Sequence, residues 1–247
     1  MNVNYLSVTA SQGPAAGSTL LDNLLGYWKL DETSGSTSND EVGSNDATLG
    51  AGCSFTSSGK INYGVDFTSS TTGVITVPQA VLMNQLTDKF TLSMWIKFDT
   101  LSSGLAYECD LFSSLSSGAT AIEILMASND RIIAYIRSSG GIWHSCNGPI
   151  ITDTTNFMHF VYMVNGQGYP PKIYINNVDV TSSSANLSFN IPNIDNANGS
   201  FIGNLNNVGS QHAIDGRIDE LAFWSRDLTS GEMAELYNSG SGNQYPF

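Results

Sequence analysis

The segment that decides the fold is FTLSMWIKF, residues 90 to 98. Its alternate positions form two sets, and one of them is uniformly apolar: Phe90, Leu92, Met94, Ile96 and Phe98. The other set is mostly polar: Thr91, Ser93, Trp95 and Lys97. Side chains of a β-strand point alternately to its two faces, so this pattern predicts a strand with one face on a hydrophobic core.

Similar strand signals recur on both sides of this segment. We expect further strands at residues 24–30, 47–49, 64–68, 73–77, 119–127, 131–137, 157–164, 172–175, 201–203 and 217–224. The strands at 64–68 and 73–77 are close enough in sequence to suggest a hairpin. Asn176-Asn177 suits a tight turn, because asparagine tolerates positive φ. Many short strands with regular turns predict an all-β sandwich or jelly roll.

One short helix is expected near the C-terminus. The sequence TSGE at 229–232 has the capping-box pattern, in which a threonine hydroxyl and a glutamate carboxylate bond each other's backbone amides. Met233, Leu236 and Tyr237 then give an apolar stripe at helical spacing. Gly240 lies just past this stripe, where a left-handed glycine can end the helix.

The composition limits the partners of such a protein. Hydrophobic residues make up 41% of the 247 residues, which is enough for a core. Charged residues are only 13%, against ~25% in a typical soluble domain. Nine basic against twenty-two acidic residues give a net charge of −13. Binding to nucleic acid or to anionic lipid requires basic surface, so we expect neither as a partner.

The chain carries no targeting signal that the sequence reveals. No apolar run approaches the ~18–20 residues that span a bilayer, so no membrane insertion is expected. The first basic residue is Lys29, and a secretion signal would need a positive charge and an apolar run before it. The odd number and wide spacing of Cys53, Cys109 and Cys146 favour buried free thiols, with one disulfide pair left open.

The chain divides into three parts. Residues 1–23 read as an N-terminal arm or linker that contains Gly13-Pro14 and has little to bury by itself. Such an arm attaches to a larger protein assembly, or is a frayed tail. Residues 24–240 form the folded domain, and residues 241–247 are expected to be a C-terminal tail.

Two stretches carry a family resemblance when they are taken together. The first is LGYWKLDETSG at 25–35, followed by DEVGSNDATL at 40–49. The second is DGRIDELAFW at 215–224, followed by RDLT at 226–229 and YNSG at 237–240. With 90–97 and 172–176 between them, this ordered set resembles a laminin-G-like domain of the concanavalin A-like lectin/glucanase superfamily. The resemblance implies a two-sheet antiparallel jelly-roll sandwich. One departure is Thr68-Ser69, where such domains often have Asp-Gly.

Because that superfamily includes glucanases, catalysis has to be tested. Retaining glycoside hydrolysis needs two carboxylates ~5–5.5 Å apart, which the glucanases supply from Glu-x-Asp-x-x-Glu on one strand. The chain contains no Glu-x-Asp-x-x-Glu, no Gly-x-Ser-x-Gly and no phosphate-binding glycine loop. His144, His159 and His212 are isolated from one another in sequence. We therefore expect a protein that is not an enzyme.

The resemblance also implies a structural calcium ion between an early loop and the last long strand. Calcium takes oxygen ligands, including backbone carbonyls in tight loops. The matching positions are Asp31 or Glu32, the carbonyl of Gly43, Asn45 and Asp219. The alternative is that Asp219 is an ordinary strand-end charge and that residues 40–46 form a solvated turn.

A glycan-binding surface would need exposed aromatic rings with nearby polar groups. The candidates are Trp143, Tyr107, Tyr169 and, for an amide, Asn206. Trp143 and Tyr169 lie among glycines and prolines, which is typical of loops. For Trp28, Trp95 and Trp224, packing in the core is the favoured interpretation, because large aromatic residues near strand centres are usually buried.

Two functional hypotheses follow. The first is a non-catalytic structural or adhesion protein displayed on a surface, most plausibly that of a phage virion. Its place there would be capsid decoration, head fibre or tail, with host or environmental glycans as its ligand. The alternative is a secreted or cell-surface carbohydrate-binding module from a polysaccharide-utilisation system. The localisation is then the virion surface or the extracellular space.

Overall fold

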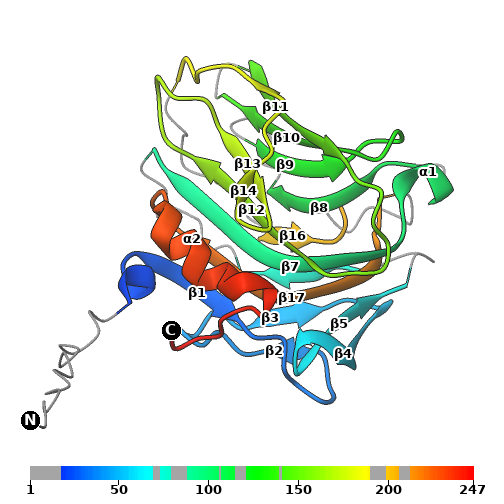
Figure 1. Cartoon of the computed structure of the whole chain (residues 1–247). Helices are drawn as coiled ribbons and strands as arrows, with labels where there is room; N and C mark the ends of the chain where they lie inside the picture. Colours follow the sequence, from blue (N-terminus) through cyan, green and yellow to red (C-terminus); the bar gives the residue numbers. More distant parts are fainter. Residues whose placement is uncertain are drawn as a thin grey trace, which may run out of the picture.

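A computed structural model describes residues 18–68, 73–78, 88–105, 107–114, 121–138, 141–189, 199–205 and 212–247 (Figure 1). Within them the chain folds as two antiparallel β-sheets with one short C-terminal α-helix. The helical segments are η1 (Thr19–Leu21), α1 (Ser102–Leu105), α2 (Ser230–Tyr237) and η3 (Asn238–Gly240). The expected all-β jelly-roll sandwich is confirmed.

The first sheet, sheet A, has the strand order β14-β13-β12-β7-β17-β5-β4, and β1 also pairs with β17. Its strands are β1 (Leu24–Trp28), β4 (Cys53–Ile61), β5 (Tyr63–Phe67), β7 (Phe90–Thr100), β12 (Met158–Val164), β13 (Lys172–Ile175), β14 (Val178–Asp179) and β17 (Asp215–Trp224). The long strand β7 lies at its centre, between β12 and β17.

The second sheet, sheet B, has the order β15-β11-β10-β9-β8-β16-β6-β3-β2. Its strands are β2 (Thr37–Ser38), β3 (Ala47–Leu49), β6 (Ile75–Val77), β8 (Cys109–Ser114), β9 (Ala121–Met126), β10 (Arg131–Arg137), β11 (Trp143–Ile150), β15 (Ser183–Ser184) and β16 (Ser200–Ile202). The run from β8 to β11 is a meander of neighbouring antiparallel strands.

The main core fills the space between the two sheets. The apolar set of β7 faces it, as the alternation predicted, together with alternate residues of β9 and β10. Three aromatic rings meet at its centre, with centroid separations of 6.1 Å for Phe90–Phe112, 5.9 Å for Phe90–Phe223 and 5.7 Å for Phe112–Phe223. Large buried rings in close contact contribute strongly to core stability.

The outer face of sheet A carries a second, smaller core. Helix α2 crosses this face in Figure 1, and it buries Met233 and Leu236 against Trp224 and Leu20. The predicted capping box is present: Thr229 accepts from the amide of Glu232, and the carboxylate of Glu232 accepts from the amide of Thr229. The left-handed residue that ends α2 is Asn238, with φ +43°, and not Gly240 as expected.

The folded domain extends beyond both of the ends predicted from the sequence. Residues 19–22 belong to the folded body, because Leu20 is buried and its carbonyl accepts from Trp224 Nε1 at 2.7 Å. The C-terminal segment is also packed, since Phe247 contacts the ring of Tyr27 at 5.5 Å. Residues 1–17, the remainder of the expected arm, lie outside the described residues.

The expected hairpin between residues 64–68 and 73–77 is wrong. β5 pairs with β4 and β17 in sheet A, whereas β6 pairs with β3 and β16 in sheet B. The chain therefore crosses from one sheet to the other between these strands, as jelly-roll connections do. The tight turn at Asn176-Asn177 is confirmed, because both residues have positive φ between β13 and β14.

Candidate functional site

The outer face of sheet B carries an exposed aromatic side chain above a small hollow. Trp143 is 45% exposed, and its ring lies 6.0 Å from the ring of Tyr135 at an interplanar angle of 81°. A hollow of about 280 Å³ is lined by Trp143, Tyr135 and Glu123. We call these three residues the aromatic patch. They come from three adjacent strands, β9, β10 and β11.

Strand register puts these side chains together. Ile122, Ile124, Ala134 and Ile136 face the core, so the alternate residues Glu123 and Tyr135 face outward. Glu123 and Tyr135 are direct cross-strand partners, and Arg137 is the partner of Trp143. The guanidinium of Arg137 lies 5.4 Å from the centroid of the Trp143 ring, which holds the indole by a cation–π contact.

Glu123 of the aromatic patch forms an acidic pair with Asp110, which lies on the neighbouring strand β8. Asp110 on β8 is fully buried, and its Oδ2 lies 3.0 Å from Nδ1 of His212. Burial and the neighbouring Asp110 raise the pKa of Glu123 to about 7. Burial also raises the pKa of Asp110, while the bond to Asp110 raises the pKa of His212.

This acidic pair does not complete the glucanase pattern along one strand. Glu108-x-Asp110 has part of the glucanase pattern, but Ser113 stands at its last position. Glu123 lies across from Ser113 on the next strand, and Asp110 is its acidic neighbour. The arrangement offers a hydrogen-bonding carboxylate beside an aromatic ring.

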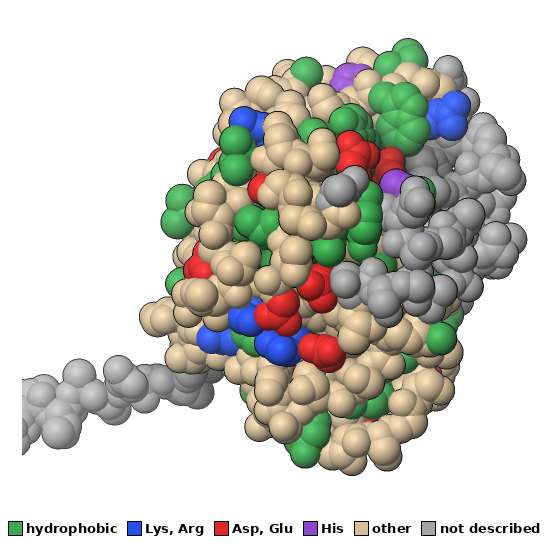
Figure 2. All heavy atoms as spheres, turned by 90° about the vertical axis from the view of Figure 1, so that its right-hand side faces the viewer, with side chains coloured by type: hydrophobic (Ala, Val, Ile, Leu, Met, Phe, Trp, Pro, Cys, Tyr) green, Lys and Arg blue, Asp and Glu red, His purple; other side chains and the backbone are tan. Residues whose placement is uncertain are grey.

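Figure 2 shows one side of the molecule, on which acidic, histidine and hydrophobic side chains gather in the upper half. Lower on the same side, basic and acidic side chains lie next to one another. Ion pairs of this kind include Arg217 with Asp66 at 3.1 Å and with Asp99 at 3.3 Å.

The structure brings only one of the predicted glycan-binding residues into the aromatic patch. That residue is Trp143. Tyr169 is 60% exposed, but it lies in a loop bound to Leu187 and does not line the hollow. Tyr107 is half-buried against the main core, so it presents no open ring. Asn206 lies outside the described residues.

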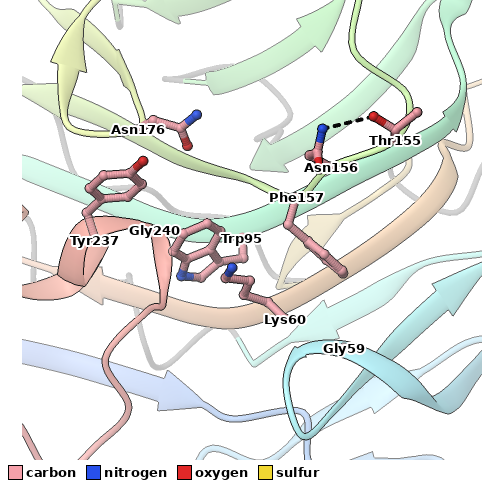
Figure 3. Close-up of a pocket in the computed structure, with 9 residues that line it drawn as sticks. All are labelled: Gly59, Lys60, Trp95, Thr155, Asn156, Phe157, Asn176, Tyr237 and Gly240. Carbon is pink, nitrogen blue, oxygen red and sulfur yellow. Dashed lines mark hydrogen bonds between the residues drawn. The ribbon is translucent and has the colours of Figure 1, made fainter.

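A second and larger cleft opens on the outer face of sheet A, beside the end of α2 (Figure 3). It has a volume of about 440 Å³, and we call it the lysine cleft. Its lining consists of Gly59, Lys60, Trp95, Thr155, Asn156, Phe157, Asn176, Tyr237 and Gly240. In Figure 3, Trp95 and Lys60 lie at its centre, with Phe157 on one side and Tyr237 on the other.

Trp95 is the floor of the lysine cleft. It is only 2% exposed, as the packing interpretation expected, but it belongs to the outer face of β7 and not to the main core. Its ring stacks on that of Tyr237 with centroids 5.9 Å apart, and it lies 5.1 Å from the ring of His159 at a tilt of 35°. Lys60 Nζ lies 4.6 Å from the Trp95 centroid. The indole is therefore covered on most sides and holds the ammonium in place.

Buried carboxylates fix the backbone next to this cleft. Asp219 Oδ2 accepts from the amides of Lys60 and Ile61 at 2.8 Å each. Asp31 Oδ1 accepts from the amide of Tyr63 at 2.9 Å, and its Oδ2 from Gln244 Nε2 at 2.7 Å. These bonds tie the β4–β5 turn to sheet A and to the C-terminal segment.

A third carboxylate, Glu220, lies behind them. It accepts from the hydroxyl of Tyr27 and, at 2.8 Å, from Gln244 Nε2. Burial raises its pKa to about 8.

The residues predicted to hold calcium do not form one set of ligands. The carboxylates of Asp31 and Asp219 are occupied by the N–H donors just described. Glu32 accepts from the amide of Asn39 at 2.8 Å, and the carbonyl of Asn45 accepts from Trp28 Nε1 at 3.1 Å. Gly43 lies beside Asp40, which binds the amide of Asn45.

In the described part of the chain, no group of three or more His, Cys, Asp or Glu side chains could hold a metal ion. As arranged, these residues do not fit calcium, and calcium binding stays a prediction.

Comparison with known proteins assigns this fold to a superfamily. A family model described as "Concanavalin A-like lectin/glucanases superfamily" matches residues 69–234. The chain belongs to this superfamily. No curated protein matches this concanavalin A-like chain in sequence. Among the described helices, none has the length and apolar character needed to cross a membrane.

Several solved structures share this concanavalin A-like fold. The binding domain of Paraclostridial Mosquitocidal Protein 1 has a TM-score of 0.67 at 17% identity, over 90% of this chain and 53% of that one. Domain 4 of AbnA, an extracellular arabinanase from Geobacillus stearothermophilus solved with arabinotriose, has a TM-score of 0.63 at 19% identity, over 90% and 98%. A Trypanosoma rangeli sialidase has a TM-score of 0.65 at 16% identity, over 90% and 34%.

The chain spans about half the length of the mosquitocidal and the botulinum neurotoxin type G binding domains that it matches. By contrast, it matches nearly the whole of the arabinanase domain. At these identities the likeness concerns the fold.

Proposed function

We propose that this concanavalin A-like domain is a non-catalytic carbohydrate-binding domain and that the aromatic patch is its sugar-binding surface. The observation that carries the proposal is the exposed Trp143 ring, which shares one hollow with Tyr135 and Glu123. Exposed indoles on a folded domain are uncommon, because burying them is strongly favourable. An indole kept open beside a carboxylate suits a ligand with both apolar and hydroxyl-bearing surface.

The chemistry of the patch matches that of a sugar ring. One face of a pyranose or furanose carries C–H groups that pack on an aromatic ring, while its hydroxyl groups need hydrogen-bond acceptors. Trp143 and Tyr135 supply the rings, and Glu123 supplies the acceptor. Arg137 holds the indole from one side, so less freedom is lost when a ligand docks.

The solved relatives support this proposal. Domain 4 of the arabinanase was solved with arabinotriose, and this chain matches 98% of its length. The sialidase was solved with 2,3-difluoro-KDN, and other relatives are described as binding domains of toxins. These proteins share the sandwich, and several of them are described by what they bind.

The test compares two exposed aromatic residues. Trp143→Ala is expected to weaken binding of neutral oligosaccharides, arabino-oligosaccharides among them, by roughly tenfold or more, because truncating an aromatic anchor removes a dominant contact. Tyr169→Ala is the matched control, since Tyr169 is exposed outside the patch. Isothermal titration on the full chain, guided by a glycan array, measures both. Equal affinity of wild type and Trp143→Ala, or release of reducing ends from the polysaccharide, would contradict the proposal.

For the setting of this domain we propose display on a virion surface. Residue 18 leaves the folded body next to η1, on the side where α2 lies, whereas β9 to β11 belong to the other sheet (Figure 1). Residues 19–22 are fixed there, because Arg226 donates to the carbonyls of Thr19 and Asp22 at 2.8 and 2.7 Å. An attachment through residues 1–17 would therefore leave the aromatic patch free. Display on a secreted or cell-surface polysaccharide-utilisation protein is the alternative.

Removing residues 1–17 separates these settings. Under the virion proposal the shortened chain loses incorporation into particles but keeps its glycan affinity. Incorporation that is unchanged by the deletion would contradict the proposed role of this segment. Capsid or portal genes next to the coding sequence would support the virion setting, and hydrolase and transporter genes would support the alternative.

A further inference from the structure

The pattern of ion pairs singles out Lys60. All nine basic residues lie in the described part of the chain, and six of them form ion pairs with carboxylates. Of the other three, Arg131 donates to the carbonyl of Gly148 at 2.7 Å, and Arg137 lies over Trp143. Lys60 lies over Trp95. Among the described residues, Lys60 is the one lysine without an ion pair to a carboxylate, in a chain with twenty-two acidic residues.

The backbone holds Lys60 in this position. Its amide and that of Ile61 bind Asp219, which lies on the long strand β17. Gly59 has to be glycine, because a Cβ there would lie 1.8 Å from the carbonyl oxygen of Tyr63. The turn is therefore fixed at both ends, and the side chain of Lys60 is directed over Trp95 toward the cleft (Figure 3). A preorganised charge binds a ligand with little ordering cost.

The walls of the lysine cleft are polar and carry no carboxylate among the lining residues of the described chain. Asn176 Oδ1 accepts from the amide of His159 at 2.9 Å, which leaves its Nδ2 to donate. Asn156 Nδ2 is bound to Asp153 and Thr155 at 2.9 Å each, which leaves its Oδ1 to accept. Phe157 and Tyr237 add ring surface. Donor, acceptor, cation and ring thus face one cavity.

The cavity is much larger than a bare ion, so we expect a larger ligand to fill it. Its volume of about 440 Å³ lies in the range of small-molecule sites. A neighbouring hollow of about 270 Å³ shares Asn156, Phe157 and Asn176 with it. The two hollows meet at these residues, so a ligand longer than one sugar unit would find a continuous surface.

We propose that the lysine cleft is a second ligand site, which binds an acidic saccharide. One anionic substituent, a carboxylate or a sulfate, contacts Lys60 Nζ, and hydroxyl groups contact Asn156 and Asn176. This site lies on sheet A, whereas the aromatic patch lies on sheet B, so the two sites are independent and each can be present without the other.

The experiment uses three probes on the full chain: digalacturonate, the corresponding neutral digalactoside, and galactose 6-sulfate. Digalacturonate is expected to bind roughly tenfold or more tightly than the neutral compound, because a hydrogen bond to a charged group is stronger than one between neutral groups. The galactose 6-sulfate arm decides whether a sulfate serves as well as a carboxylate. Titration calorimetry gives the affinities.

Four variants locate the site. Lys60→Gln is expected to lose roughly tenfold or more in affinity for the acidic probe, while Lys60→Arg keeps most of it. Lys89→Gln is the matched control for charge, because Lys89 is ion-paired with Asp227 at 2.8 Å and does not line the cleft. Trp143→Ala is expected to bind the acidic probe like the wild type.

Several results would overturn this proposal. They are an equal loss in Lys60→Gln and Lys89→Gln, loss of acidic binding in Trp143→Ala, or no binding of either acidic probe. Neutral glycan binding that depends on Trp143 would still support the aromatic patch in each case. Conversely, failure of every neutral glycan with retained, Lys60-dependent acidic binding would contradict only the aromatic patch.

Discussion

The outer faces of the two sheets differ in how they are covered. On sheet A, η1, α2 and the C-terminal segment bury Trp224, Leu236 and Tyr27 in a second core. On sheet B, the described strands β9 to β11 leave Trp143 45% exposed above a hollow. Among the described residues, a second core covers the outer face of sheet A, and the ring of Trp143 on sheet B stays exposed.

This difference shows where ligands can reach the fold. The covered face has an opening beside the end of α2, and that opening is the lysine cleft. The outer face of sheet B offers the exposed ring of Trp143 above a hollow, with acidic groups next to it. The two outer faces therefore suit different roles: the covered face of sheet A suits attachment, and the face of sheet B that exposes Trp143 suits ligand recognition.

The largest expected effect tests whether the covered face is a true second core. Trp224→Ala and Phe223→Ala remove rings from opposite faces of the same strand, and both rings are fully buried. Each is expected to lower the free energy of unfolding by about 3–5 kcal/mol, as for other buried aromatic residues. Urea denaturation measures both, with Trp143→Ala as an exposed control. A loss under about 1 kcal/mol for Trp224→Ala would mean that this layer is loosely packed.

The next effect concerns the buried carboxylate behind the covered face. The pKa of Glu220 is raised by burial from its usual 4.5 to about 8. The folded state then holds this proton more tightly than the unfolded state, so the free energy of unfolding falls as pH rises from 4.5 toward 8. Glu220→Gln is expected to flatten this dependence. Thermal unfolding between pH 5 and 8 checks it; an unchanged slope would contradict burial of the ionisable group.

A smaller effect is expected on the open face. The pKa of Glu123 is raised to about 7, with Asp110, His212 and Glu108 as its charged neighbours. The ionised carboxylate is a stronger hydrogen-bond acceptor than the protonated carboxyl group, so neutral glycans should bind severalfold more tightly at pH 8 than at pH 6. Glu123→Gln should remove the dependence. Titration calorimetry at both pH values decides; tighter binding at pH 6 would mean that the protonated pair is the binding form.

The smallest expected effect concerns calcium. Because Asp219 binds three backbone amides, those of Lys60, Ile61 and Glu220, it acts as an anchor of the β4–β5 turn. We expect EDTA and added calcium to leave the Tm within about 1 °C, while Asp219→Asn lowers it whether or not calcium is present. A fall in Tm with EDTA that calcium reverses, and that Asp219→Asn abolishes, would restore the calcium prediction.

Local signals in the sequence were sufficient for some of the elements, while the strands β4, β8 and β11 were not predicted. The alternation in β7 and the capping box of α2 depend on residues a few positions apart, and both are present as predicted. Pairing between β5 and β6 was predicted wrongly, because strand partners are chosen by the whole jelly roll and not by the connecting residues. The left-handed end of α2 also fell on Asn238 and not on the nearby glycine.

The candidate sites were harder to predict. Trp143 stood out among glycines, but Tyr135 and Glu123 gave no signal, because only the cross-strand register brings them together. Lys60 could not be recognised, since its position depends on Asp219, 159 residues away.

The four tryptophans report on the four environments that this account distinguishes. Trp28 lies in the main core, Trp224 in the second core, Trp95 in the lysine cleft and Trp143 in the aromatic patch. The most direct measurement is therefore a titration of the ¹⁵N-labelled protein with a neutral oligosaccharide, followed through the indole N–H signals. The account predicts that the Trp143 signal shifts while those of Trp28 and Trp224 stay in place. A titration in which Trp143 does not move, while binding is saturated, would contradict it.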